Sequence, residues 1–119
     1  MIIITKLPCK QLSPNARLHW AKKIKYKNID KEAGFFDTKQ VMKGVKPFTK
    51  DDKLSIQITY YYADKCRRDI DNAVASSKAL LDAVFLALGI DDYQVKISKR
   101  TEILYDKTNP HTRIELEVI

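Results

Sequence analysis

The chain has 119 residues, of which 45% are hydrophobic, and this is enough for one folded domain (residues 1–119) with its own core. No apolar run approaches the roughly 18 residues of a membrane span, and two cysteines without close spacing predict neither a disulfide framework nor a zinc site. Lys and Arg outnumber Asp and Glu by 22 to 15, and residues 1–50 hold the excess, with a net charge of +9 against −2 for residues 51–119. We expect the second half to supply carboxylates and the first half to present a basic surface to phosphates, with a solvated helix face as the alternative for its lysines.

The N-terminal third of the chain predicts a strand, a loop and a basic helix. Ile2–Leu7 is a β-branched run that predicts a first strand. It is too short for the apolar core of a signal peptide, so we expect reduced cysteines and a cytoplasmic protein. Ser13–Asn15 predicts a loop. A helix is expected from His19 to about Ala33, with Gly34 as its end. The packing face of this helix would carry Trp20, Ile24 and Ile29.

The middle of the chain contains the clearest strand. Leu54–Tyr62 alternates apolar and polar side chains, which is typical of a strand with one buried face. The preceding residues 35–53 are ambiguous, and a second helical piece as far as Met42 is one alternative.

The C-terminal part predicts one more helix and two more strands. Asp71 or Asn72 can cap a helix that ends at Gly89. Residues 93–104 and 112–118 then predict strands. The resulting order β-α-β-α-β-β predicts an α/β (α+β) protein, in which two main helices pack on one face of a small mixed sheet.

Two aspartates, Asp69 and Asp71, lie where the middle strand hands over to this helix. In an extended stretch residues i and i+2 point the same way, so both carboxylates can face one point beyond the sheet edge. Two such groups repel unless a cation neutralises them, and Mg²⁺ prefers oxygen ligands and takes only one or two carboxylates per ion. The alternative is a helix cap. The basic pair Arg67–Arg68 directly before them favours a metal site that faces a phosphate backbone.

A second acidic pair, Asp91–Asp92, lies beyond the helix, and taken alone it fits a turn. A helix of roughly 17 residues spans ~25 Å. The following loop must therefore bring the chain back for Asp92 to approach Asp71, or the carboxylate must come from a neighbouring strand or subunit. Lys78 and Asp82 lie one helical turn apart. They fit a surface ion pair, or Lys78 offsets charge on a transferred phosphoryl group.

Three segments have the order and spacing of a known family: Arg68-Asp69-Ile70-Asp71-Asn72, Lys78-Ala79-Leu80-Leu81-Asp82-Ala83 and Gly89-Ile90-Asp91-Asp92-Tyr93-Gln94-Val95. Together they resemble the RusA-type Holliday junction resolvases. Leu12–Trp20 also resembles a loop of that family, and matching strands extend the resemblance over nearly the whole chain. The resemblance implies a homodimeric, magnesium-dependent crossover junction endodeoxyribonuclease of phages and prophages, which resolves four-way DNA junctions by paired symmetric nicks.

The resemblance also implies the catalytic residues. Asp69, Asp71 and Asp92 would be the ligands of one or two Mg²⁺ or Mn²⁺ ions, with Asp91 as the alternative to Asp92. Lys78 would match the family's catalytic lysine, although it lies three residues further from the second aspartate than usual, nearly one helical turn. The ion would make water a better nucleophile for in-line attack, and the products would be a 5′-phosphate and a 3′-hydroxyl.

On this hypothesis the partner is branched DNA, with no membrane and no nucleotide cofactor. Basic side chains would contact phosphates, and two aromatic rings could stack at the branch point. The side chains expected to contact nucleic acid are Asn15, Arg17, His19, Trp20, Lys22, Lys23, Arg67 and Arg68. For Trp20, packing in the core is the alternative.

Other function classes stay open. A non-catalytic basic DNA-binding protein, such as a decayed prophage remnant, explains the charge but not the carboxylates. A structural subunit that binds an acidic protein likewise explains the basic charge but not the carboxylates. A phosphatase or glycosyltransferase that uses Asp-x-Asp would need a loop that cradles phosphate, and three glycines in 119 residues do not offer one.

Overall fold

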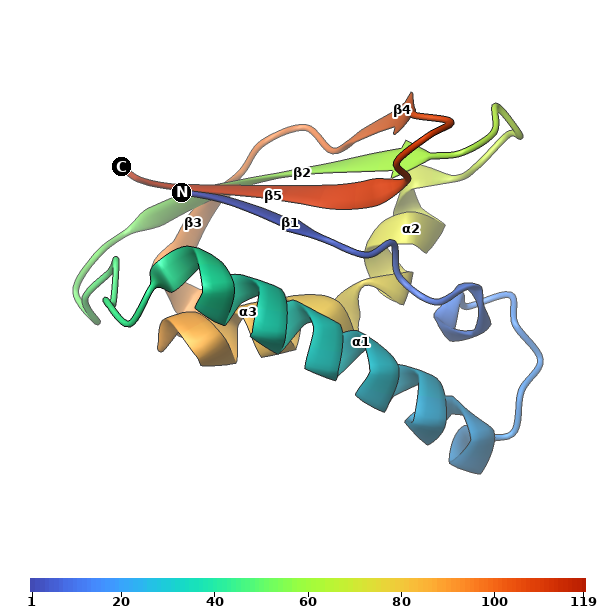
Figure 1. The fold of residues 1–119 in the computed structure, drawn as a ribbon, viewed down its shortest axis with the longest axis horizontal. Helices are drawn as coiled ribbons and strands as arrows, with labels where there is room; N and C mark the ends of the chain where they lie inside the picture. Colours follow the sequence, from blue (N-terminus) through green and yellow to red (C-terminus); the bar gives the residue numbers. More distant parts are fainter.

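The computed structural model describes residues 1–119 as a five-stranded mixed sheet with the helices packed against one face (Figure 1). The predicted α/β class and the one-sided layering are therefore confirmed. None of the helices is both long and apolar enough to cross a membrane. The elements in chain order are β1 (Ile2–Thr5), η1 (Lys10–Leu12), α1 (Trp20–Met42), β2 (Leu54–Tyr62), α2 (Ile70–Ser76), α3 (Lys78–Leu88), η2 (Asp92–Gln94), β3 (Val95–Ser98), β4 (Glu102–Tyr105) and β5 (His111–Val118).

Strand β2, at the predicted bounds, organises the sheet. It pairs antiparallel with β5 on one side, and β5 in turn pairs antiparallel with the edge strand β1. On its other side β2 pairs in parallel with β3 and then with β4. The prediction of one strand over residues 93–104 is therefore wrong. The chain forms two short strands along the same edge, and the Lys99 N–H between them donates to the Ile56 carbonyl at 2.8 Å.

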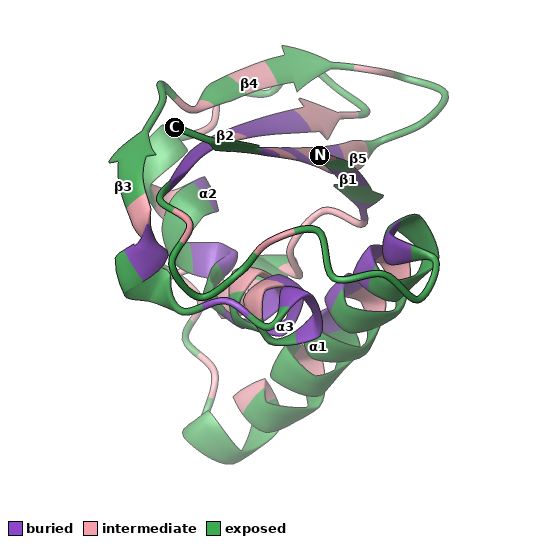
Figure 2. Ribbon diagram, turned by 90° about the vertical axis from the view of Figure 1, so that its left-hand side faces the viewer, coloured by how far each residue is buried: buried purple, intermediate pink, exposed green.

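The hydrophobic core lies between the sheet and the helices, where Figure 2 shows the buried segments of α1, α3 and β2 facing inward. Alternation along β2 and β5 turns every second side chain toward this layer. Tyr60 is fully buried there, and its hydroxyl lies 2.6 Å from Ser77 Oγ, so the phenol has a polar partner at the bottom of the core. The largest fully buried apolar side chains are Ile3, Leu54, Leu80, Leu88, Ile114 and Leu116.

Helix α1 runs through Gly34, so the prediction that Gly34 ends it is wrong. The missing side chain instead lets α1 approach α3: a Cβ on Gly34 would lie 2.8 Å from the Leu80 carbonyl oxygen and 3.2 Å from Leu80 Cδ1. The helix ends only at Lys43, whose left-handed φ of 52° is followed by Gly44 with φ 79°. Met42 is thus the last helical residue, as the alternative helical piece anticipated.

The packing face predicted for α1 is also wrong. The helix contacts the core through Asp30, Gly34, Thr38 and Met42, which lie from its middle to its C-terminal end. Residues 20–29 include no buried position, so the first turns of α1 lie at the margin of the domain. The three side chains expected to pack are exposed, namely Trp20, Ile24 and Ile29.

Candidate metal and nucleic-acid site

Asp69 and Asp71 lie together at the start of α2. Asp69 has an extended backbone and is the N-cap, and its Oδ1 accepts a hydrogen bond from the Asp71 N–H at 2.9 Å. The cap is therefore Asp69 rather than Asp71 or Asn72. Both carboxylates are exposed at the end of β2, after a six-residue loop. Asp69 uses only one of its side-chain oxygens to cap the helix, and the side-chain oxygens of Asp71 accept no hydrogen bond from the chain.

Neither carboxylate forms an ion pair, although two arginines precede them. Arg68 turns away: its guanidinium stacks on the Tyr62 ring at 3.9 Å and reaches Asp64 Oδ1 at 2.8 Å. It also donates to the carbonyl oxygens of Asp64 and Cys66, both at 3.1 Å. The hydrogen bond from the Cys66 N–H has the largest effect on the Asp64 carboxylate and lowers its pKa, and the hydrogen bond from Arg68 lowers it further. Arg68 thus folds the loop before α2 and leaves Asp69 and Asp71 uncompensated.

Two hollows meet at Asp69. The first, of about 620 Å³, is lined by residues 67–72 and contains both carboxylates. The second, of about 300 Å³, lies between η1 and α2 and is lined from the N-terminal side by Lys10 and Ser13. Arg67 lines both hollows and has no ion-pair or hydrogen-bond partner. Nothing in the sequence predicts a site at Lys10, and Ser13 is predicted only as part of a loop, because the two residues form no pattern until the fold places them beside α2.

Asp92 lies in a different hollow. Asp91 and Asp92 begin the short helix η2, which is fixed by Gln94: the Gln94 side chain accepts from the Asp91 N–H at 3.0 Å and donates to the carbonyl of Thr49 at 2.9 Å. Exposed Asp92 lines a hollow of about 320 Å³ together with Val74. Val74 lies one helical turn after Asp71 in α2, so the two hollows are neighbours along that helix.

The three aspartates do not meet in this conformation of a single chain. No group of three or more His, Cys, Asp or Glu side chains is close enough to hold one ion. The carboxylates near each other are Asp69 and Asp71, and Asp92 stands apart from them. A site with all three would need these side chains or η2 to move, or a carboxylate from a second copy of the chain.

Lys78 lies on the far side of a break in the predicted single helix. Ser77 has φ −88° and ψ −1°, and its N–H bonds the Val74 carbonyl at 3.0 Å, one residue short of the helical spacing. The break separates α2 from α3, which Lys78 begins. Its side chain is 80% exposed and pairs with Asp82 at 3.7 Å. The ion pair expected from the sequence is therefore present, and Lys78 lines none of the three hollows described above.

The loop that carries the other expected DNA contacts is tied to α1 by a buried carboxylate. Asp30 is fully buried and forms an ion pair with Lys6. It also accepts from the Cys9 N–H at 3.0 Å and from Cys9 Sγ at 3.1 Å. Burial, with Asp30 beside it, raises the pKa of the Cys9 thiol, which keeps it protonated and able to donate. The loop therefore leaves the sheet at a fixed point, beside η1.

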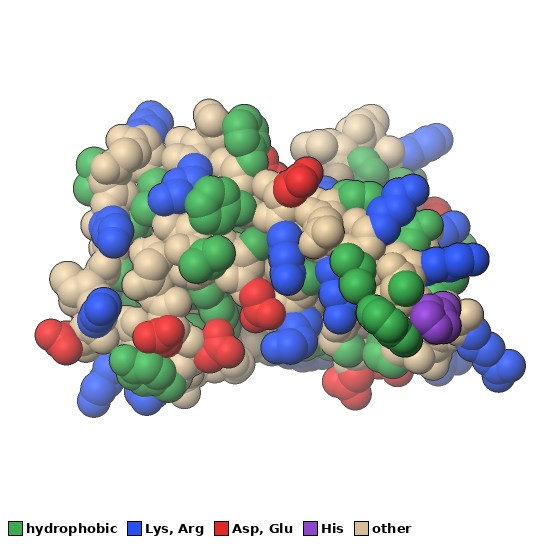
Figure 3. Space-filling model, turned by 90° about the horizontal axis from the view of Figure 1, so that it is seen from below, with side chains coloured by type: hydrophobic (Ala, Val, Ile, Leu, Met, Phe, Trp, Pro, Cys, Tyr) green, Lys and Arg blue, Asp and Glu red, His purple; other side chains and the backbone are tan.

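The expected DNA-contacting side chains of this loop and of α1 face solvent. Trp20 is 69% exposed, which rules out the alternative of core packing. His19 caps α1, with its Nδ1 accepting from the Ala21 N–H at 3.2 Å, and its ring lies 5.5 Å from that of Trp20. Arg17, Asn15 and Lys22 are exposed, and Lys23 is half-buried. Figure 3 shows the helix layer with basic side chains spread among hydrophobic and acidic ones, so the face is mixed rather than uniformly basic.

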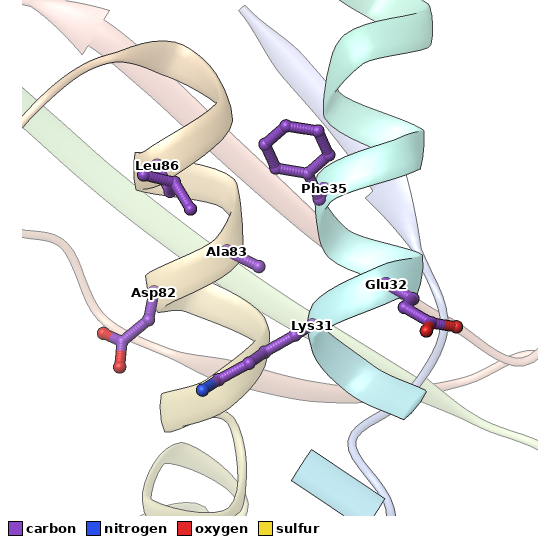
Figure 4. A pocket seen from close by; sticks show the side chains of 6 residues that line it. All are labelled: Lys31, Glu32, Phe35, Asp82, Ala83 and Leu86. Atoms are coloured by element: carbon purple, nitrogen blue, oxygen red, sulfur yellow. The ribbon is translucent and has the colours of Figure 1, made fainter. Parts of the chain in front are cut away.

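An apolar hollow of about 370 Å³ lies elsewhere, between α1 and α3. In Figure 4 the side chains of Phe35 and Leu86 face each other across it, Lys31 reaches toward α3, and Glu32 points away. Asp82, at its edge, is the partner of Lys78. This hollow offers apolar contact and no grouped catalytic side chains, so the chemistry is expected at the polar end of α2.

The comparisons with known proteins add little to this geometry. No family model matches the chain. A protein of Xylella fastidiosa (strain Temecula1), described as an uncharacterized protein, is 33% identical over 87 residues, which cover 71% of this chain and 56% of that protein. The chain thus spans about half the length of the curated relative it matches, and that relative's description brings no activity with it.

Proposed function

We propose that the protein is a structure-selective, metal-dependent endonuclease that resolves four-way DNA junctions by paired symmetric nicks. The observation that carries the proposal is the carboxylate pair Asp69–Asp71, exposed and without an ion-pair partner although two arginines stand beside it. Asp69 caps α2, but the two exposed carboxylates also repel each other, and a cation between them would remove that repulsion. The sequence resemblance supports the same reading through the same residues.

The donor set fits a magnesium ion. Mg²⁺ takes hard oxygen ligands, keeps several waters and commonly uses one or two protein carboxylates together with phosphate oxygens. Asp69 and Asp71 offer such oxygens at the mouth of a hollow of about 620 Å³ that has room for them. When bound, the ion would ease the deprotonation of the attacking water and offset negative charge at the scissile phosphate.

The other residues are assigned supporting roles. Arg67 neutralises a phosphate beside the carboxylates, and Trp20 stacks on a base at the branch point. Asp92 serves as a third carboxylate across the neighbouring hollow or from the partner in a homodimer. Lys78, on α3, offsets charge at the phosphate from further along the helix layer. A two-fold dimer presents two equivalent sites, which matches the two equivalent strands of a junction.

The test is cleavage of a synthetic four-way junction and of linear duplex DNA of the same sequence, with and without Mg²⁺. We expect metal-dependent nicks in opposed strands of the junction and little cutting of the duplex. Asp71→Asn should abolish cutting and leave junction binding intact. Asp51→Asn is the matched control, because Asp51 is an exposed carboxylate outside these hollows. Cutting by Asp71→Asn at the wild-type rate would remove the basis of the proposal.

A second candidate is a non-catalytic basic DNA-binding protein. The observation that favours it is the separation of Asp92 from Asp69 and Asp71, which leaves one chain without a complete three-carboxylate group. Such a protein would bind the junction with the same salt dependence and would produce no nicks with Mg²⁺ or Mn²⁺. The cleavage experiment therefore separates the two functions directly.

A further inference from the structure

We propose that the hollow between η1 and α2 is a phosphate subsite, which holds one backbone phosphate of a nucleic-acid strand next to the phosphate at Asp69 and Asp71. The inference rests on the proposed nuclease function and states how that site grips its strand. It assigns a binding role to Lys10 and Ser13, two residues in the N-terminal segment.

The donors in this hollow are free. Lys10 comes from η1 and Arg67 from the loop before α2, and neither side chain has a hydrogen-bond or ion-pair partner within the chain. Ser13 Oγ accepts from the Asn15 N–H at 3.3 Å, so its own hydroxyl hydrogen is available to a ligand. Ser76 Oγ, by contrast, already donates to the Asn72 carbonyl at 2.7 Å. Two cations and one hydroxyl thus converge from separate segments.

The charge of the hollow selects an anion. Three cations line it against the single carboxylate of Asp69, and one of the three, Arg68, is already paired with Asp64. The adjoining hollow is less positive, because Asp71 joins Asp69 at its wall and Lys10 does not reach it. A cationic hollow beside one that carries two carboxylates suits two successive phosphates of one strand. One phosphate is reached through a divalent ion, and the next is bound directly by Lys10 and Arg67.

The shape and anchoring of the hollow agree with this ligand. Its volume of about 300 Å³ exceeds that of a phosphate group and leaves room for the attached sugar. Lys10 follows Cys9, whose N–H is bound to fully buried Asp30 at 3.0 Å. This tether fixes the backbone that carries Lys10, so little conformational freedom is lost when a strand binds.

The first test is the salt dependence of binding to a fluorescent four-way junction, measured without divalent ions so that no cutting occurs. Lys10→Gln should lower the slope of log affinity against log salt by about one, equivalent to roughly three- to fourfold between 50 and 200 mM salt. Lys50→Gln is the matched control, because Lys50 is exposed and lies outside the hollow. Its slope should equal that of the wild type. Equal slopes for all three proteins would overturn the subsite.

The second test places the contact on the strand. A single uncharged methylphosphonate is introduced in turn at each phosphate beside the mapped nick, and at one distant position. The affinity loss caused by Lys10→Gln should disappear on one of the two adjacent substitutions and persist on the distant one. A loss that is the same on all substrates contradicts the subsite. If the wild-type protein cuts the junction but Lys10→Gln behaves like Lys50→Gln, only the subsite fails. If the wild type neither binds nor cuts, the nuclease proposal itself fails.

Discussion

Glutamine substitutions at the adjacent residues Arg67 and Arg68 are expected to impair different properties of the protein. Arg68→Gln removes a guanidinium that stacks on Tyr62 at 3.9 Å and donates to two backbone carbonyls at 3.1 Å each. Arg67→Gln removes an exposed side chain that has no partner in the chain. The first variant should therefore lose stability, and the second should lose affinity for DNA.

The expected loss for Arg68→Gln can be worked from these contacts. The stack on a half-buried ring contributes about 0.5–1 kcal/mol. Each hydrogen bond to a carbonyl contributes about 1 kcal/mol, at the lower end for a charged donor because the Arg68 side chain is 26% exposed. The sum is about 2–3 kcal/mol, which for a domain of this size lowers Tm by roughly 8–12 °C. Arg67→Gln should change the free energy of unfolding by less than about 0.5 kcal/mol.

The assay combines thermal melts followed by circular dichroism with the salt dependence of junction binding. Arg68→Gln should melt earlier and, at a temperature where it is folded, keep the wild-type salt slope. Arg67→Gln should keep the wild-type Tm and lose about one unit of slope. The reasoning is refuted if Arg68→Gln keeps its Tm while its salt slope falls, since Arg68 would then contact DNA rather than fold the loop.

Two further predictions concern the core. Gly34→Ala should lower the free energy of unfolding, measured by calorimetry, by about 1–2 kcal/mol. The new Cβ would lie 2.8 Å from the Leu80 carbonyl oxygen, and this overpacking outweighs the gain of ~1 kcal/mol in helix propensity. An unchanged or higher Tm would contradict this packing. Burial raises the pKa of Tyr60 to about 12. The stability that this shift contributes should be complete below the unfolded pKa near 10 and lost as the pH rises through 12. Tyr60→Phe should therefore flatten the fall in Tm at alkaline pH, and the exposed control Tyr93→Phe should not.

The sequence predicts best where a local pattern meets a buried face. Strand β2 has the expected bounds because its apolar side chains alternate with polar ones over the whole length of the strand. The acidic pair does lie between β2 and the next helix, but six residues separate it from the strand and Asp71 is already helical, so the extended i, i+2 geometry expected for the pair is wrong. The predicted helix end at Gly89 also holds, with a left-handed φ of 72°.

The errors arise where a residue acts through a distant partner. Gly34 is an ordinary helix-end signal in sequence, and only the proximity of Leu80 on α3 shows that the missing side chain allows two helices to touch. Arg67 and Arg68 are indistinguishable in sequence. In the structure Arg68 stacks on the Tyr62 ring and forms an ion pair with Asp64, and Arg67 does neither. No local pattern could assign these roles, because the partners become neighbours only when the domain folds.

The position of Asp92 was open for a related reason. The helix break at Ser77 and the anchoring of η2 through Gln94 decide which way the second acidic pair faces, and both depend on tertiary contacts. The sequence does not predict a role for Lys10, since a single lysine carries no signal until the backbone beside it is bound to buried Asp30. The exposed carboxylates of the candidate site could thus be named from the sequence, and their arrangement could not.

The claim on which the proposed function depends is that Asp69 and Asp71 hold a divalent ion. Paramagnetic broadening of backbone amide signals by substoichiometric Mn²⁺ tests it directly, without DNA and without turnover. The account predicts that broadening is strongest at residues 69–72, is displaced by Mg²⁺ and is absent in Asp71→Asn. Broadening confined to other carboxylates, or none near α2 at millimolar ion, would contradict it.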